Sequence, residues 1–382
     1  MPTLILTRST AKQYDFDDDI YIGSWANLNP LNGNKGATLP YHWADKSKKV
    51  KDAKYLHDKA HKILDQLFPI MNRLHNTQYS KKYWDRLLAN WLNRFLIILF
   101  DRYSMINEAA NLDEINRVVI VDKSVQELIA LDIPQFNQLA EENDYWNLCI
   151  YSEIIKKYTK MNYTVTTLDD EFSKTYNFIN REKNQNFNFL FNKIQNFLFS
   201  NKKYFFVNTY FSYRLKLDLL FNSAILNKKL KNVFIEPRPI DKRMRGALKL
   251  DLTNIPFNDL IKTFLPKMIP VSFIEGYKSL NVLSKRMGLS SKSSIILTSN
   301  FHWQCHPFMH WVAKSCETGS KFYISEHGSH SISKVNATYS MDYIIADKII
   351  HRGDQKKKLM ISAIGDYINY KKKLKPKNNG CI

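Results

Sequence analysis

The chain has 382 residues, of which 44% are hydrophobic, so it can bury a substantial core and does not have the composition of a disordered protein. Its longest apolar run, residues 95–100, is far shorter than a membrane span, and its N-terminus lacks the features of a secretory signal. The four cysteines are widely separated and form no CxxC pair, which predicts free thiols in a reducing compartment. We therefore expect a cytoplasmic protein.

The chain is strongly basic, with 56 Lys and Arg residues against 36 Asp and Glu residues and a formal net charge of +20. Such a surface can attract nucleic acid, an anionic membrane or a nucleotide-linked substrate. The basic residues are scattered, and Lys, Asn, Ile, Tyr and Phe are all abundant, so AT-rich coding is the simplest explanation. Among the functional explanations, peripheral association with the cytoplasmic face of the inner membrane is favoured over nucleic-acid binding.

The N-terminal segment contains two short apolar runs that predict buried strands. They span residues 3–8 and 20–25 and are joined by an acidic turn. Gly23 and Trp25 follow the apolar part of the second run. Because parallel sheets bind ligands beyond the carboxyl ends of their strands, both residues are candidates for a binding site.

A Gly- and Asn-rich loop at residues 26–39 comes next and leads into His42 and Trp43. Loops of this length in compact domains are often functional. His42 and Trp43 are equally consistent with a binding site and with an aromatic anchor that packs ahead of the next helix.

Two long helices are predicted within residues 45–110, as an insertion after the first strands. Asp45 and Ser80 are their expected N-caps, and the apolar residues of the first helix recur at helical spacing. Pro69 lies inside the first helix, where it should cause a kink or a stop.

On the second of these helices three arginines recur every eight residues, close to one helix face. They are Arg86, Arg94 and Arg102. This spacing permits an anion-binding stripe, but solvated or salt-bridged arginines are the commoner explanation.

The rest of the chain alternates short apolar runs with helical patterns. Strands are expected at residues 117–122, 204–210, 233–236, 294–299, 321–325, 342–346 and 358–365, and helices at 133–142, 144–157, 214–222, 271–287 and 307–318. This alternation predicts an α/β fold, a Rossmann-like parallel sheet flanked by helices. The last residues, 366–382, form a basic and polar tail that we expect to be disordered.

A stiff basic loop follows the strand expected at residues 233–236. It contains Arg238 and Arg245, whose guanidinium groups could clamp a phosphate or a carboxylate at the strand end. A solvated charge run is an equal alternative.

Residues 293–330 form the clearest strand–helix–strand unit. Pro307 fits the first turn of its helix, and Gly319 is placed to end that helix with a left-handed backbone. Four polar or small residues follow the carboxyl ends of its two strands, namely Asn300, Glu326, His327 and Gly328. His327 can act as a base or a hydrogen-bond donor near neutral pH, while Gly328 allows a ligand to approach the backbone.

The same region carries a row of histidines at four-residue spacing, His302, His306 and His310, with Cys305 between them. On one continuous helix this row would resemble a metal site, but Pro307 indicates that the helix starts after His302. We therefore expect packing or capping roles and no bound metal. The chain lacks GxxxxGK[ST], GxGxxG after a strand, GxSxG and HExxH, so ATPase, Rossmann dehydrogenase, α/β-hydrolase and zincin activities lose support.

Six collinear regions resemble one family of proteins. They are YIGSW (21–25), LPYHWADKSK (39–48), YWDRLLANWLNRFLIILFDRY (83–103), LPKMIPVSFIEGYKSL (265–280), LTSNFHW (297–303) and EHGSHSIS with ADKII (326–333 and 346–350). The family is the leptospiral-type transferase family of O-antigen and other surface-polysaccharide gene clusters. The resemblance implies a GT-B-like glycosyltransferase, in which two Rossmann-type domains enclose a nucleotide-sugar cleft without a bound metal or cofactor.

The resemblance also implies roles for individual residues. His327 would be the catalytic base or a ligand of the leaving group. The implied substrate-binding residues are Gly23, Trp25, His42, Trp43, Arg238, Arg245, Glu275, Asn300, Glu326 and Gly328. The donor co-substrate would be a nucleotide-sugar, and the acceptor would be a glycan or a lipid-linked sugar at the cytoplasmic membrane face.

The chain departs from the family pattern near its C-terminal end, where few residues follow the segment that should lead into the second domain. We therefore expect residues 1–365 to form a GT-B-like N-terminal, acceptor-side domain, with the C-terminal nucleotide-sugar domain absent. Such a chain would be a truncated or degenerate glycosyltransferase, or half of a split enzyme with a separate donor-domain chain. The alternative is a non-catalytic binding module, so enzymatic activity of this chain alone stays an open question.

Overall fold

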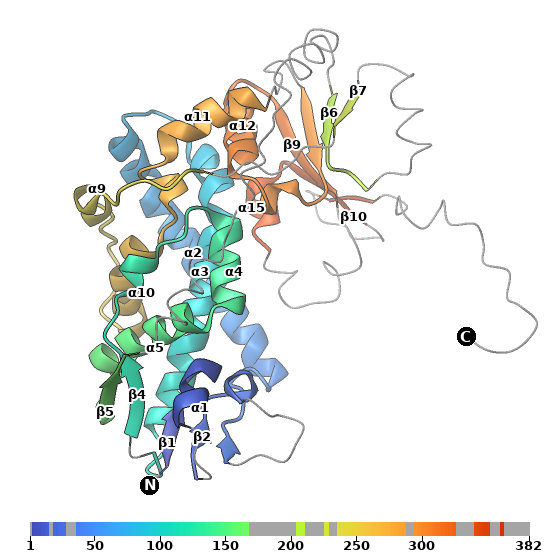
Figure 1. Cartoon of the computed structure of the whole chain (residues 1–382). Coiled ribbons are helices and arrows are strands. Elements are labelled where there is room, and N and C mark those ends of the chain that lie inside the picture. Colours follow the sequence, from blue (N-terminus) through green and yellow to red (C-terminus); the bar gives the residue numbers. More distant parts are fainter. Residues whose placement is uncertain are drawn as a thin grey trace, which may run out of the picture. The chain divides into compact units, whose positions relative to one another are not determined.

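The computed structural model describes residues 2–14, 18–27, 36–115, 117–167, 204–210, 225–228, 235–287, 294–325, 340–351 and 360–362. The chain divides into two compact units. Unit 1 comprises Met1–Asn186 and Val233–Val282, and unit 2 comprises Phe187–Asn232 and Leu283–Ile382. Each unit is built on a parallel sheet of its own (Figure 1).

The sheet of unit 1 has the strand order β3-β2-β1-β4-β5, and all neighbouring strands run parallel. The strands are β1 (Thr3–Ile5), β2 (Ile20–Tyr21), β3 (Ala37–Thr38), β4 (Arg117–Val121) and β5 (Tyr163–Thr166). Leu4 lies opposite Ile20 on one side and Val118 on the other, and all three are buried. Strands covered on both faces can be continuous apolar runs, which is why the sequence pattern identified them.

Helices cover this sheet and extend beyond it. They are α1 (Arg8–Tyr14), α2 (Lys46–His75), α3 (Lys81–Ala110), α4 (Ile133–Glu142), α5 (Asp144–Tyr158), α9 (Lys242–Gly246), α10 (Pro256–Met268) and α11 (Tyr277–Arg286), which begins in unit 1. Short 3-10 turns occur at Ser24–Ala26, Val125–Leu128 and Val271–Phe273. The paired long helices α2 and α3 are the predicted insertion (Figure 1).

Both long helices begin at the predicted N-caps. The Asp45 carboxylate accepts a hydrogen bond from the Ser47 amide at 2.8 Å, and the Ser80 hydroxyl accepts one from the Tyr83 amide at 3.2 Å. Each bond satisfies a backbone N–H that the first helical turn leaves unpaired. These caps confirm the two predicted starts.

A kink or a stop was predicted at Pro69, and the stop is wrong, because α2 continues through this residue to His75. Pro69 is exposed, whereas the next two residues, Ile70 and Met71, are buried against the rest of unit 1. Apolar packing of the following turn therefore offsets the hydrogen bond that a proline removes from a helix.

The core of unit 1 is built around α3. Its side chains Trp84, Trp91 and Phe95 are completely buried, and α3 packs against α2, α4, α5 and α10. A helix surrounded in this way needs apolar residues on several faces, which explains the many aromatic residues in its sequence.

The sheet of unit 2 has the strand order β11-β10-β9-β8-β6-β7, and its neighbouring strands also run parallel. The strands are β6 (Tyr204–Val207), β7 (Ile225–Lys228), β8 (Ile295–Thr298), β9 (Lys321–Ser325), β10 (Lys348–His351) and β11 (Met360–Ser362). The described helices are α12 (His306–Glu317) and α15 (Asp342–Ile345), with a 3-10 turn at Phe301–Trp303.

The unit formed by β8, α12 and β9 confirms the prediction for this region. Pro307 lies in the first turn of α12. Gly319 follows the helix with a φ of 104°, and the amide of Ser320 donates to the carbonyl of Ser315 at 3.0 Å. A positive φ at this position favours glycine because it has no Cβ to clash with the backbone.

The predicted fold class, α/β with Rossmann-like parallel sheets flanked by helices, is confirmed. However, we expected a single parallel sheet in one domain over residues 1–365. The described strands instead form two sheets in two compact units. Strand–helix alternation predicts parallel pairing, but it looks the same whether successive strands join one sheet or start another.

Several predicted elements also differ in detail. Residues 342–345 form the helix α15 and not a strand, and the predicted helix at 271–287 begins only at Tyr277. Ile235 and Glu236, at the end of a predicted strand, have no strand pairing. Short apolar runs cannot distinguish a strand from a buried turn of helix by periodicity. The helix predicted at 214–222 and the tail at 366–382 lie outside the described residues.

Within the described ranges, no helix has the length and continuous apolar character that crossing a bilayer requires.

His75, at the end of α2, makes the stability of the protein depend on pH. Its ring stacks on Tyr277 with a centroid distance of 4.1 Å, and its Nε2–H donates to the carbonyl of Phe273 at 2.8 Å. Burial lowers the pKa of His75 to about 4, because the charged ring loses its hydration. The unfolded chain, with a histidine pKa of about 6.5, therefore binds more protons than the folded chain between these two pH values.

We expect the free energy of unfolding to decrease as the pH falls from about 6.5 to about 4, and the His75 contribution to be on the order of 3 kcal/mol. Urea denaturation over a pH series measures this dependence. His75→Gln removes the titrating group, so its curve should be flatter than the wild-type curve in this window. Parallel curves for the two proteins would contradict the assignment to His75.

Candidate functional site

A cavity of about 610 Å³ lies at the carboxyl-end edge of the sheet in unit 1. This volume is within the range of small-molecule binding sites. The wall combines residues that follow β1, β2 and β3 with residues of α3, α4 and α5. The principal lining residues are Thr7, Gly23, Trp25, Leu39, Tyr41, Trp43, Arg94, Asp101, Arg102, Glu141, Asp144, Asn147 and Tyr151. Parallel α/β sheets bind ligands at this edge, as predicted for Gly23 and Trp25.

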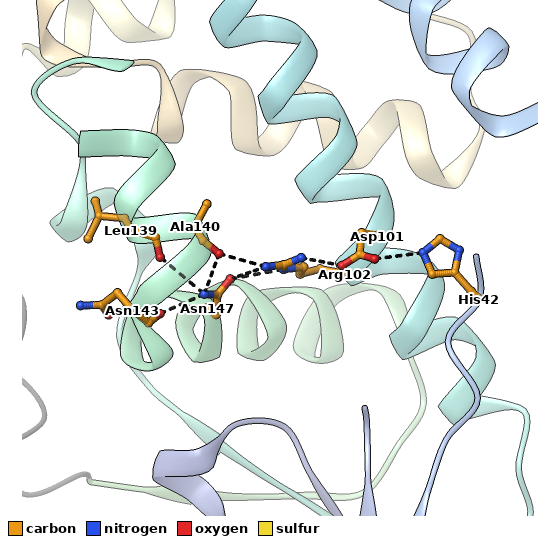
Figure 2. Close-up of polar contacts among 7 residues, drawn as sticks. All are labelled: His42, Asp101, Arg102, Leu139, Ala140, Asn143 and Asn147. Carbon is orange, nitrogen blue, oxygen red and sulfur yellow. Dashed lines mark hydrogen bonds and ion pairs between the residues drawn. The ribbon is translucent and has the colours of Figure 1, made fainter. Parts of the chain in front are cut away.

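A chain of charged and polar contacts supports one wall of the cavity (Figure 2). Asp101 and Arg102 are consecutive residues of α3. Asp101 accepts a hydrogen bond from His42 at 3.1 Å through Oδ1 and pairs with Arg102 at 2.5 Å through Oδ2. These contacts tie the segment that precedes α2 to α3.

Arg102 continues this chain toward α4 and α5 (Figure 2). Its guanidinium donates to Asn147 Oδ1 at 3.0 and 3.2 Å and to the carbonyl of Ala140 at 3.2 Å. The Asn147 amide in turn donates to the carbonyl of Asn143 at 2.9 Å. Together with the pairing to Asp101, these contacts occupy four of the five N–H donors of Arg102 and fix its guanidinium group in one orientation.

The ionised form of Asp101 is stabilised by its neighbours. Burial alone would raise the pKa of Asp101, but the hydrogen bond from His42, the charge of Arg102 and the hydrogen bond from Tyr41 outweigh it and lower this pKa. Burial and the same carboxylate raise the pKa of the Tyr41 hydroxyl. Tyr41 is therefore a neutral donor to a permanent carboxylate at neutral pH.

The ring of His42 is held by both of its nitrogens. The Lys48 ammonium lies 3.0 Å from Nδ1 and can only donate, so Nδ1 accepts and Nε2–H donates to Asp101. The residue is 5% exposed and does not line the cavity. His42 thus positions Asp101, and the prediction that it contacts substrate stays untested.

Aromatic rings supply the apolar part of the cavity wall. Trp25 and Tyr41 meet edge to face at 5.8 Å, and Tyr41 and Trp43 do so at 6.0 Å. Trp25 lies directly over Gly23, where a Cβ would come within 2.3 Å of the indole ring. Gly23 is therefore needed for the placement of the Trp25 ring. Burial raises the pKa of Tyr151, next to Trp25, to about 12.

A second ion pair lies on the cavity wall, between Arg94 of α3 and Glu141 of α4. Its side chains are 36% and 54% exposed. Exposed pairs contribute little to stability, so ligand hydroxyl groups can replace water around this pair at small energetic cost. Two members of the predicted arginine series, Arg94 and Arg102, thus line the cavity, and both are paired with carboxylates.

Other predicted site residues of unit 1 lie outside the cavity wall. Arg245 is 2% exposed, donates to both Glu275 oxygens at 2.7 and 2.8 Å, and donates to the carbonyls of Pro266 and Ile269. These contacts indicate a structural clamp between α9 and the segment before α11. Arg238 donates to the Ser279 hydroxyl at 2.8 Å on the surface. Their predicted binding roles stay predictions.

In unit 2, Asn300 follows β8, and its amide donates to the Tyr210 hydroxyl at 2.7 Å. Tyr210 follows β6, the neighbouring strand. Glu326, His327 and Gly328 follow β9 in the sequence but lie outside the described residues. Their predicted roles are therefore untested.

The histidine row is buried in unit 2. His302, His306 and His310 are at most 3% exposed, and His302 Nε2 lies 3.1 Å from Asp342 Oδ1. Burial lowers the pKa of His310 to about 3. Among the residues with described positions, no group of three or more His, Cys, Asp or Glu side chains could hold a metal ion.

Sequence patterns did not identify several residues of the cavity. Asp101, Glu141, Asp144, Asn147 and Tyr151 stand on helices whose patterns predict only packing or solvent exposure. A weak signal was available in the charged pair at 101–102, which directly follows the apolar run 95–100, since buried charges require partners.

Parallel sheets flanked by helices define an α/β protein of the Rossmann-like class. The chain belongs to the LIC12162 family of transferases, whose family model matches residues 2–382. The predicted membership in a transferase family is therefore confirmed. No curated protein and no solved structure matches the chain significantly.

Removal of the Arg102 guanidinium should destabilise unit 1. Arg102→Met leaves the buried Asp101 carboxylate without its cation, and we expect a loss of about 3 kcal/mol in the free energy of unfolding. Combination with Asp101→Asn should recover part of this loss, because the unpaired charge disappears. Urea denaturation of the single and double variants measures the coupling.

Lys123→Met is the matched control. Its ion pair with Glu127 joins side chains that are 42% and 55% exposed, so the expected change is at most about 0.5 kcal/mol. Equal losses in Arg102→Met and Lys123→Met would show that the contacts of Arg102 do not support the fold.

Proposed function

We propose that the protein is a glycosyltransferase of surface-polysaccharide biosynthesis, which transfers a sugar from a nucleotide-sugar to a lipid-linked or glycan acceptor. The cavity of unit 1 would bind the acceptor sugar. The observation that carries this proposal is the combination, in one cavity, of aromatic rings with planar carboxylate, amide and guanidinium groups.

This combination suits a sugar better than a purely apolar or a purely ionic ligand. A pyranose has apolar C–H faces, which can pack on rings such as Trp25 and Trp43. Its hydroxyl groups both donate and accept, so they can bond to carboxylates and guanidinium groups in the same wall. The half-exposed pair of Arg94 and Glu141 supplies both kinds of partner.

The described cavity residues favour binding over proton transfer. Asp101 is engaged by three donors, and its lowered pKa makes it a poor base. His42 has both ring nitrogens occupied. We therefore keep His327, which follows β9, as the proposed base or leaving-group ligand.

The strand order of unit 2 supports a donor-side role for this unit. From β6 the chain adds β7 on one side and β8 on the other, so the order of strands reverses between β6 and β8. Open α/β sheets bind nucleotides at such switch points, beyond the carboxyl ends of the strands. Asn300 and Tyr210 lie at these two strand ends and bond to each other.

We therefore propose that unit 2 binds the nucleotide-sugar. In this proposal the second domain, which was expected to be absent or to come from a separate chain, corresponds to unit 2. The non-catalytic alternative keeps the same cavity but predicts that no sugar is transferred.

Transfer from a panel of radiolabelled nucleotide-sugars to membrane glycolipid extracts tests the proposed reaction. Gly23→Ala tests the cavity: its Cβ would force the Trp25 ring aside, so we expect KM for the acceptor to rise about tenfold with a smaller change in kcat. Gly246→Ala is the matched control, because a Cβ there meets nothing within 4 Å, and we expect unchanged kinetics.

Three outcomes separate the possibilities. Transfer with the expected difference between Gly23→Ala and Gly246→Ala supports the proposal. Transfer that is equal in both variants would remove the cavity as acceptor site. Sugar binding without transfer from any donor would support the non-catalytic alternative.

Asn300→Ala should weaken nucleotide binding by the full chain. Loss of one side-chain partner at the proposed donor site should reduce the affinity for UDP, GDP or CMP about tenfold, which calorimetry can measure. Asn254→Ala, at an exposed position of unit 1, is the control and should bind normally. Equal affinities of both variants would contradict a donor site at β6 and β8.

A further inference from the structure

The first turns of α2 carry a concentration of lysines that the fold does not require. Residues 46–54 contain five lysines, opposed only by Asp52. The first turn contains no acidic residue. Lys46, Lys48 and Lys49 lie in the first turn, where they face the positive end of the helix dipole and so weaken the helix. Helix stability therefore does not explain this charge.

Three of these lysines and one valine form an exposed band on α2, which we call the α2 lysine band. Lys46, Val50, Lys51 and Lys54 are all exposed. Lys46, Val50 and Lys54 are spaced four residues apart and so line up along one side of the helix. Val50, with 42% of its surface exposed, adds an apolar side chain among the positive charges.

The helix turns that carry the α2 lysine band are joined to the cavity wall through two other residues, Lys48 and Asp52. The Trp43 indole N–H donates to Asp52 at 3.0 Å, and Lys48 reaches both Asp52 at 3.2 Å and His42 at 3.0 Å. Tyr41 and Trp43 on this segment line the cavity, and Tyr41 is 40% exposed. The band and the cavity-lining segment are therefore close along the chain but lie on different sides of α2.

We infer that the α2 lysine band docks the protein on an anionic lipid surface. Lysines that flank an exposed apolar side chain match the interface of a bilayer, where charges meet headgroups and apolar groups enter the acyl boundary. Both lysine and arginine bind nucleic-acid phosphates, but residues 46–54 contain no arginine to bind a phosphate with two parallel hydrogen bonds. The exposed valine among the lysines fits a membrane better than a nucleic acid.

This surface would bring the cavity to lipid-linked acceptors. That consequence rests on the proposed function, whereas binding to the lipid surface does not. Because docking can be measured without any sugar, its failure and the failure of glycosyl transfer are separate results.

Vesicle co-sedimentation of the full chain tests the inference. Vesicles of phosphatidylcholine alone are compared with vesicles of phosphatidylcholine and phosphatidylglycerol in equal parts. We expect binding to the anionic vesicles only, with an affinity that falls as salt rises. Lys46→Gln, Lys51→Gln and Lys54→Gln together should reduce it on the order of a hundredfold, since each lysine near an anionic surface contributes roughly fivefold.

The matched control removes the same charge from exposed lysines elsewhere on unit 1, with Lys160→Gln, Lys242→Gln and Lys249→Gln. Its affinity should stay within about threefold of wild type, because these charges lie outside the band. Thermal denaturation should show that the band variant is at least as stable as wild type, since Lys46 opposes the helix dipole in the first turn and Lys51 and Lys54 are exposed.

Val50→Ser distinguishes a bilayer from other polyanions. It should weaken binding to the anionic vesicles and leave any binding to duplex DNA unchanged, because only the bilayer receives the apolar side chain. Equal losses in the two lysine variants would attribute binding to net charge and overturn the inference. Tighter binding to duplex DNA than to the anionic vesicles would also overturn it.

Discussion

The pair of the buried Asp101 and the partly buried Arg102 is the constraint on which the candidate site depends. Consecutive residues of a helix point about 100° apart, so one faces the segment before α2 and the other faces α4 and α5. Asp101 fixes His42, while Arg102 fixes Asn147 and the carbonyl of Ala140. Two charges in a low-dielectric wall require such complete sets of partners. The pair therefore sets the distance between three segments that the sequence leaves far apart.

The same contacts decide what kind of chemistry the cavity can perform. A carboxylate with three donors and a lowered pKa is a fixed acceptor, and it has little tendency to take a proton from a sugar hydroxyl. Rigid acceptors and donors beside aromatic rings are instead suited to orienting a ligand. If the protein transfers sugars, the cavity contributes orientation, and the proton must be accepted by a group outside this wall.

Local rules predicted the parts of the structure that depend on near neighbours. Gly23 and Trp25 were placed at a strand end by the pattern of one apolar run, and Asp45 and Ser80 were identified as caps by the residues that follow them. Asp101 could not be paired with His42 in this way, because 59 residues separate them. Arg245 and Glu275 were each predicted to bind substrate; in the structure they bond to each other, and their predicted roles stay untested. A charged side chain looks the same in the sequence in both situations.

The positive charge of the chain is a second case in which the sequence does not show what a charged side chain contacts. Composition gives only the total, and AT-rich coding is a sufficient explanation for a scattered excess of lysine. The positions of individual lysines in the structure add information that composition lacks, because lysines in the first turn of a helix oppose the helix dipole and weaken the helix. In the α2 lysine band this unfavourable charge lies beside an exposed valine and a segment that lines the cavity. If the band docks on an anionic lipid surface as proposed, the lipid charge would offset this repulsion, so docking would also stabilise the start of α2.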